Sequence, residues 1–139
     1  MTKKEITDQL EQIVSKQDFA THSAELIETW ISVGLGIEAI EPIIRFMENH
    51  PTVDYGAPGA LVHFVERFYG NGYEEILVES IKRKPTGHTV AMLNAVINGT
   101  KTIKIKKQLI EVMQQVKSNP LADQITLQQA NHFLERLTT

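Results

Sequence analysis

Residues 86–99 read TGHTVAMLNAVING, and this stretch indicates most directly how the chain folds. From Val90 to Ile97 every residue except Asn94 is apolar. Pro85 precedes the run and Gly99 follows it, and both residue types favour the ends of helices. Because a helix that is apolar on all sides is normally buried by its neighbours, we expect this helix to lie in the middle of an all-helical fold.

Helical spacing continues on both sides of this stretch. Apolar residues recur at intervals of three and four in further segments, which end at glycines, prolines or polar residues. The stripes run over Ile6–Val14, 21–33, Ile40–Met47, Leu61–Phe68, Tyr73–Ile81, Leu109–Val116 and Ala130–Leu137. The motif TIKIK at 102–106 alternates as a strand would, but no second strand is available to pair with it, so we expect a helix there too.

The segment 21–33 carries the widest apolar arc. Its apolar side chains are Ala24, Leu26, Ile27, Trp30, Ile31 and Val33, whereas Glu25 and Glu28 belong to its polar side. An arc of this width indicates contact with more than one neighbouring helix. We therefore expect the apolar side chains of this segment to be buried.

Two prolines divide the second half of the chain into helix pairs. Pro58 to Lys84 and Pro85 to Lys117 each contain two apolar stripes separated by a glycine-containing break. Antiparallel helix pairs with an imperfect period of about 30 residues resemble a short HEAT-like array, and an irregular helical bundle is the alternative. With 139 residues the chain suits a single all-helical domain over residues 1–139.

Composition narrows the cellular setting. The sequence has no cysteine, which excludes disulfide bonds and thiolate chemistry. Its first residues, MTKKEITDQLEQIV, lack the apolar stretch of a signal peptide, and no apolar run approaches the roughly 18 residues of a membrane span. We expect a cytoplasmic protein without a membrane partner.

The charges are unevenly distributed along the chain. Residues 1–80 contain 14 Asp and Glu against 5 Lys and Arg, whereas residues 81–120 contain 8 Lys and Arg against Glu111 alone. Such segregation is either an accident of solvated helix faces or the signature of surfaces that bind charged partners.

The acidic residues of the second and third helices are the first candidate site. They are Glu25, Glu28, Glu38, Glu41 and Glu48. A cluster of carboxylates on a helical face attracts a basic protein and speeds the encounter. We therefore predict a protein-binding module that uses this acidic face, with an ordinary solvated surface as the alternative.

The loop DYGAPG at 54–59 is the second candidate. It lacks the glycine spacing and the lysine of a phosphate-binding loop, and no strand precedes it. Its glycines and Pro58 suit a tight corner between helices. The alternative is a binding rim in which Asp54 and an exposed Tyr55 contact the partner.

The basic residues between 82 and 107 support a different hypothesis. Lys82, Arg83 and Lys84 close one helix, and Lys101, Lys104, Lys106 and Lys107 open a later one. They would suit a nucleic-acid-associated protein. The segment contains only one arginine and no aromatic residue, and most of the chain is acidic, so nucleic acid remains the alternative partner.

Catalytic and metal-binding patterns are weak. His63 and Glu66, three residues apart, could share a metal, but the second copy of the motif that a two-metal bundle requires is missing. No serine lies in a nucleophile elbow. We predict a non-enzymatic protein without metal or cofactor, and a small enzyme built from dispersed residues is the remaining alternative.

Two segments relate the chain to a known group of proteins. They are DYGAPGALVHFVERF at 54–68 and KRKPTGHTVAMLNAVING at 82–99. In these segments the chain resembles the small α-helical, HEAT-like immunity proteins of bacterial contact-dependent and polymorphic toxin systems. The resemblance implies that the chain neutralises a toxin by binding it, and it implies no particular binding residues.

Overall fold

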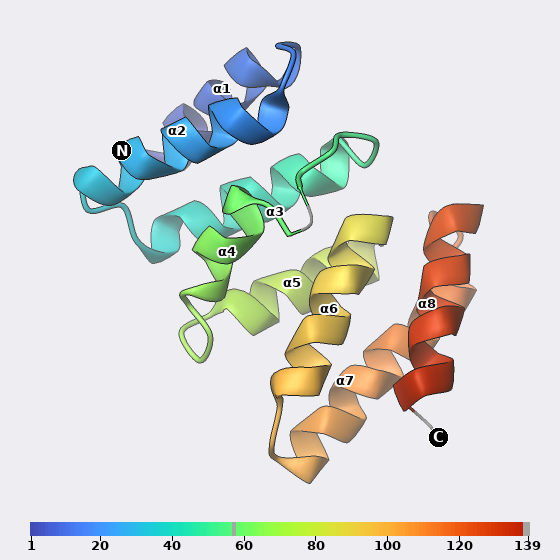
Figure 1. Ribbon diagram of the computed structural model, residues 1–139. Coiled ribbons are helices and arrows are strands. Elements are labelled where there is room, and N and C mark those ends of the chain that lie inside the picture. The colour runs from blue at the N-terminus through green and yellow to red at the C-terminus, as the bar shows by residue number, and fades with distance from the viewer. Residues whose placement is uncertain (57, 138–139) are drawn as a thin grey trace. The chain divides into compact units, whose positions relative to one another are not determined.

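The computed structural model describes residues 1–56 and 58–137, and all of its regular elements are helices (Figure 1). This confirms the all-α prediction, including a helical TIKIK motif, in which the helix starts at Ile103. The α-helices are α1 (Lys3–Val14), α2 (Phe19–Ser32), α3 (Ile40–Asn49), α4 (Ala60–Glu66), α5 (Tyr73–Arg83), α6 (Gly87–Gly99), α7 (Ile103–Gln115) and α8 (Gln124–Leu137). Two short 3₁₀ helices, η1 (Ile37–Ala39) and η2 (Val116–Ser118), adjoin α3 and α7.

The chain divides into two compact units, Met1–Ile76 and Leu77–Thr139, with the boundary inside α5. The helix pairs expected after Pro58 and after Pro85 correspond to α4 with α5 and to α6 with α7. The single domain expected over residues 1–139 stays a prediction.

Side-chain caps begin several of the helices. Thr2 Oγ1 accepts a hydrogen bond from the Glu5 backbone N–H at 3.1 Å, and Glu5 Oε1 accepts one from the Thr2 N–H at 3.4 Å. This is the capping box that the spacing of the two residues predicts. Asp18 caps α2 in a left-handed conformation, so that α2 starts at Phe19, two residues earlier than its sequence pattern predicts.

Trp30 anchors the core of the first unit. The closest packing in this unit is of α1 on α3 and of α2 on α4. The Trp30 indole is fully buried, and its ring centroid lies 6.2 Å from that of Phe64 in α4. Its Nε1 donates a hydrogen bond to Gln9 Oε1 of α1 at 2.7 Å, which satisfies the one polar atom of the ring. One side chain therefore connects three helices.

In the second unit α6, α7 and α8 pack against one another. Leu93 and Ile97 of α6 are fully buried, as is Met113 of α7. However, Ala91 and Ala95 of α6 are exposed. The prediction that neighbours bury this helix on all sides is therefore wrong. Alanine is small enough to lie at the surface with little exposed apolar area, and a pattern that counts it as apolar overestimates the buried arc.

Candidate protein-interaction surface

The end of α2 determines which of its last side chains are buried. Gly34 adopts a left-handed φ of 77°, and its N–H donates to the Ile31 carbonyl at 3.0 Å. The N–H of Leu35 reaches back to the Trp30 carbonyl at 2.9 Å. These two bonds form a Schellman motif, in which the residue after the glycine folds back onto the helix. Leu35 is consequently buried beside the end of the helix.

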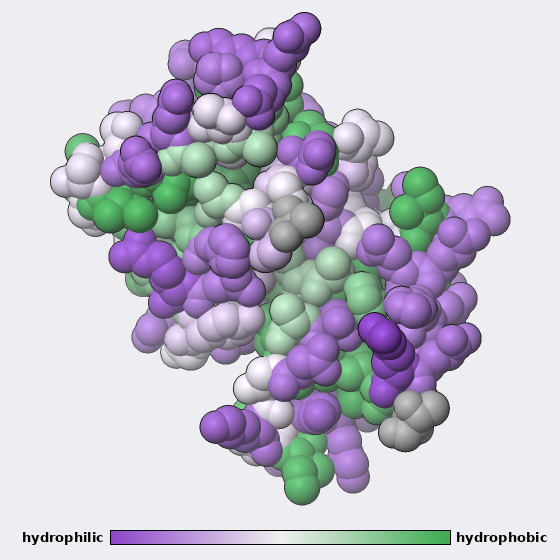
Figure 2. Space-filling model, viewed as in Figure 1, coloured by the Kyte–Doolittle hydropathy of each residue, from purple (hydrophilic) through white to green (hydrophobic). Residues whose placement is uncertain are grey.

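The residues on either side of Leu35 point outward. Ile31 is 47% exposed, Val33 63% and Ile37 59%. Figure 2 shows hydrophobic side chains gathered where α2 ends and the chain turns toward α3. The predicted burial of Ala24, Ile31 and Val33 is therefore wrong, because the apolar arc of α2 is wider than the face that α1 and α4 cover.

Two carboxylates lie on the same side of α2 as Ile31. Glu25, Glu28 and Ile31 follow one another at intervals of three along α2, so they lie on one side of the helix. Glu25 and Glu28 are exposed and form no ion pair within the part of the chain that the structure describes. We call this surface the α2 edge, defined by Glu25, Glu28, Ile31, Val33, Ile37 and Glu38.

Glu38 keeps its negative charge firmly. Its own backbone N–H and that of Gly36 donate to the carboxylate, and they hold the pKa of Glu38 below its usual value. The α2 edge thus combines exposed aliphatic side chains with carboxylates. Exposed apolar groups with a polar rim are typical of protein-binding surfaces.

No known protein family, curated protein or solved structure matches the chain. The resemblance to immunity proteins thus stays a prediction.

Two of the predicted acidic residues do not belong to the α2 edge. Glu41 of α3 pairs with Lys3 Nζ at 3.0 Å and with Arg45 Nε at 3.8 Å, so its charge is largely compensated. Glu48 is only 5% exposed. Its expected place on a solvated acidic face is wrong, because the face of α3 that contains Glu48 is one that the rest of the protein covers.

The DYGAPG loop is a corner rather than an open rim. Tyr55 is only 2% exposed, its ring lies 5.6 Å from that of Phe19, and its hydroxyl donates to the His50 carbonyl at 2.8 Å. The predicted exposure of Tyr55 is therefore wrong. Asp54 is exposed, but its carboxylate accepts the Gly56 N–H at 2.9 Å and so shapes the turn. Ala57 of this loop lies outside the described residues.

His63 and Glu66 of α4 do come together, as their spacing predicts. His63 Nδ1 lies 3.2 Å from Glu66 Oε1, with the imidazole largely exposed. No third histidine or carboxylate joins them, and no group of three or more metal-binding side chains occurs in residues 1–56 and 58–137. The described part of the chain likewise has no helix that could cross a membrane.

Most lysines of the second unit carry uncompensated charges. Among the described residues, no ion pair involves any of seven lysines: Lys82, Lys84, Lys101, Lys104, Lys106, Lys107 and Lys117. The first turns of α7 also expose two isoleucines, Ile103 at 72% and Ile105 at 47%. We call this surface the α7 tip, defined by Lys101, Ile103, Lys104, Ile105 and Lys107.

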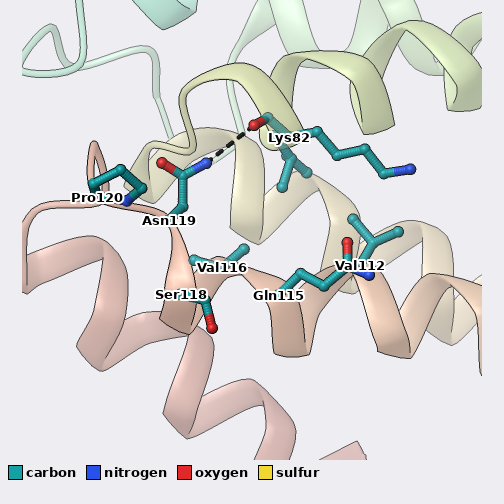
Figure 3. A pocket seen from close by; sticks show the side chains of 8 residues that line it. Lys82, Val112, Gln115, Val116, Ser118, Asn119 and Pro120 are labelled. Carbon is teal, nitrogen blue, oxygen red and sulfur yellow. Dashed lines mark hydrogen bonds between the residues drawn. The ribbon is translucent and has the colours of Figure 1, made fainter.

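A shallow pocket of about 320 Å³ lies in the second unit, between the end of α5 and the end of α7 (Figure 3). Its apolar wall is formed by Ile81, Val112 and Val116. Asn119 uses its amide for structure, because Nδ2 donates to the Lys82 carbonyl at 3.0 Å and Oδ1 accepts the Leu121 N–H at 2.9 Å. The pocket is thus bordered by a polar side chain that is already bonded.

The residues that sequence reasoning missed are the exposed aliphatic ones. The sequence pattern places Ile31 and Val33 in the core and indicates no role for Ile37, Ile103 and Ile105. A signal did exist, since the arc of the segment 21–33 exceeds what one helix normally buries, and the isoleucines of TIKIK alternate with lysines instead of following the stripe that continues at Leu109.

Proposed function

We propose that the chain is a non-enzymatic protein-binding module that recognises a basic protein through the α2 edge. One observation carries the proposal: three aliphatic side chains are exposed around the end of α2, and Ile31 among them shares one side of the helix with two carboxylates that have no ion-pair partner in the described chain. Such a surface offers an apolar centre for affinity and a charged rim for steering. The resemblance to toxin-immunity proteins suggests that the partner is a toxin.

The partner should present a complementary surface. Its centre should be apolar, to cover Ile31, Val33 and Ile37, and its rim should contain lysines or arginines opposite Glu25 and Glu28. Association should be fast and should slow as salt is added, because exposed charges at the rim act mainly on the encounter rate.

Capture from a lysate of the native host tests this proposal. The edge variant Glu25→Lys, Glu28→Lys, Ile31→Ser should lose the partner that wild type captures, with an unchanged helical circular dichroism spectrum. Glu75→Lys with Glu79→Lys is the matched control, because it reverses two exposed, unpaired carboxylates of α5 and should retain the partner. Equal capture by the edge variant and wild type would refute the role of the α2 edge.

The toxin hypothesis has a test of its own. Genes next to this one in the host are cloned and expressed, and a product that arrests growth is then co-expressed with wild type or with the edge variant. Wild type should restore growth and the edge variant should not. If the captured partner is not toxic, the binding function is still supported and the immunity hypothesis is refuted.

Nucleic-acid binding is the second candidate, and the uncompensated lysines of the second unit favour it. Under this hypothesis Lys104→Gln, Lys106→Gln and Lys107→Gln weaken binding to DNA or RNA and reduce its salt dependence, whereas the edge variant leaves both unchanged. The two candidates therefore predict opposite effects of the two sets of variants.

A further inference from the structure

The α7 tip projects from the second unit instead of packing on it. Between Lys101 and Gln108 every side chain is exposed except Lys106, which is half-buried, and Leu109 is the first buried residue. Figure 2 shows a hydrophobic side chain between hydrophilic ones at the turn from α6 into α7. Isoleucine in such a position contributes little to the core of its own unit.

The charges of the tip also disfavour its own helix. The first turn of α7 contains no acidic residue, and Thr102 forms no side-chain cap. The N-terminus of a helix carries a partial positive charge, so the charge of a lysine there destabilises the helix. A lysine at the C-terminus of a helix would stabilise it. Neither packing within the unit nor the stability of α7 therefore explains why isoleucines and lysines are exposed together at the tip. Binding to an external surface that is anionic and partly apolar would explain it.

The α2 edge has that chemistry, with the charges reversed. It exposes aliphatic side chains at Ile31, Val33 and Ile37 beside carboxylates, and the tip exposes Ile103 and Ile105 beside lysines. We propose that the α7 tip of one molecule docks on the α2 edge of a second copy of the chain. The proposal rests on the α2 edge being a binding surface, as in the proposed function, and it adds a basic, apolar ligand that the protein itself supplies.

A second copy fits the tip better than nucleic acid does. The tip has no arginine and no aromatic side chain, so it offers neither bidentate phosphate binding nor base stacking. Exposed isoleucines gain nothing from a phosphate backbone, but they gain from contact with other aliphatic side chains. The two patches are small, so the association belongs to the weak, reversible class and yields to a tighter partner at the α2 edge.

Sedimentation velocity of the purified full chain, over a concentration series at low salt, tests the proposal. Wild type should show an average mass that rises with concentration and falls back to the monomer when the salt is raised to about 0.5 M, where the Debye length is only a few ångströms. Two variants each remove one patch: an edge-null (Glu28→Lys, Ile31→Ser) and a tip-null (Ile103→Ser, Lys104→Glu). Each alone should remain monomeric.

The mixture of the two variants is the decisive sample. The edge-null keeps an intact tip and the tip-null keeps an intact edge, so equal amounts should form a one-to-one dimer. The proposal is overturned by wild type that stays monomeric throughout, by an edge-null that associates as wild type does, or by a mixture that stays monomeric. It is also overturned if only a labelled DNA duplex, and no second copy, binds the tip.

The outcome is separable from that of the proposed function. The tip-null should capture the partner from the lysate at least as well as wild type, because its α2 edge is intact and no second copy competes for it. Partner capture without self-association would refute this inference alone, and self-association without a partner would refute the proposed function alone.

Discussion

At the residue scale, Gly34 shows how one backbone conformation sets the chemistry of a surface. Its left-handed φ lets the chain turn back at the end of α2, which buries Leu35 and leaves Val33 and Ile37 outside. A residue with a side chain would adopt this φ at a cost of about 1–2 kcal/mol, although nothing lies within 4 Å of its Cβ position. The exposed aliphatic residues of the α2 edge thus result from the same turn that completes the core beneath them.

Three glycine-to-alanine substitutions separate conformational strain from steric overlap. Gly34→Ala should lower the free energy of unfolding by about 1 kcal/mol, from φ alone. Gly59→Ala should lower it by roughly 3 kcal/mol or more, because the new Cβ would overlap the backbone carbonyl of Tyr55. Gly99→Ala, with open space and an ordinary φ, should change it by less than about 1 kcal/mol. Urea unfolding measures all three, and an equal loss at Gly59 and Gly34 would contradict the close packing of the loop.

At the element scale, helix periodicity and capping explain most of what the sequence predicts correctly. The apolar stripes and the capping box of Thr2 and Glu5 are local patterns, and the structure confirms both. The errors at Ile31, Glu48 and Tyr55 concern which face of an element another element covers. That depends on tertiary packing, which a periodic pattern does not contain. The sequence therefore predicts the carboxylates of the α2 edge but not the exposure of its aliphatic side chains.

The start of α8 offers a test of a cap that depends on pH. Asp123 Oδ1 accepts the Thr126 N–H at 2.8 Å, and hydrogen bonds from the Thr126 side chain and backbone hold the pKa of Asp123 below its usual value. Asp123→Ala should lower the free energy of unfolding by about 1 kcal/mol at pH 7. Asp123→Asn keeps a hydrogen-bond acceptor at this position, so its free energy of unfolding should fall by less than that of Asp123→Ala.

The sign of the pH effect follows from the direction of that shift. The folded state binds the Asp123 proton less readily than the unfolded state, so the stabilisation is full above the unfolded pKa of about 3.9 and is lost as the pH falls through the lower, folded pKa. Unfolding curves between pH 7 and pH 2 should therefore converge for wild type and Asp123→Asn at the acidic end. A gap that widens toward low pH would show that Asp123 is not bonded as an anion.

At the scale of the whole molecule, the charge segregation follows the division into units. The unit Met1–Ile76 contains 13 Asp and Glu against 5 Lys and Arg, and the unit from Leu77 onward contains 4 against 9. In the first unit bases compensate some of the acids, as in the pairs of Lys3 with Glu41 and of Lys4 with Asp8. The net charge of −3 therefore describes neither surface.

This distribution predicts how the intact protein behaves on charged matrices. At pH 7 and low salt it should be retained by a cation exchanger despite its negative net charge, because the lysines of the α7 tip are exposed and uncompensated. Lys101→Gln, Lys104→Gln and Lys107→Gln together should let it elute at clearly lower salt.

The matched control replaces Lys3, Lys4 and Arg45 by Gln, which changes the net charge equally but removes cations that are paired with Glu41 or Asp8. Since paired cations contribute little to the outward field, this control should elute close to wild type. Flow-through of wild type, or equal shifts in both variants, would show that net charge, and not the basic surface of the second unit, governs how the protein meets a charged partner.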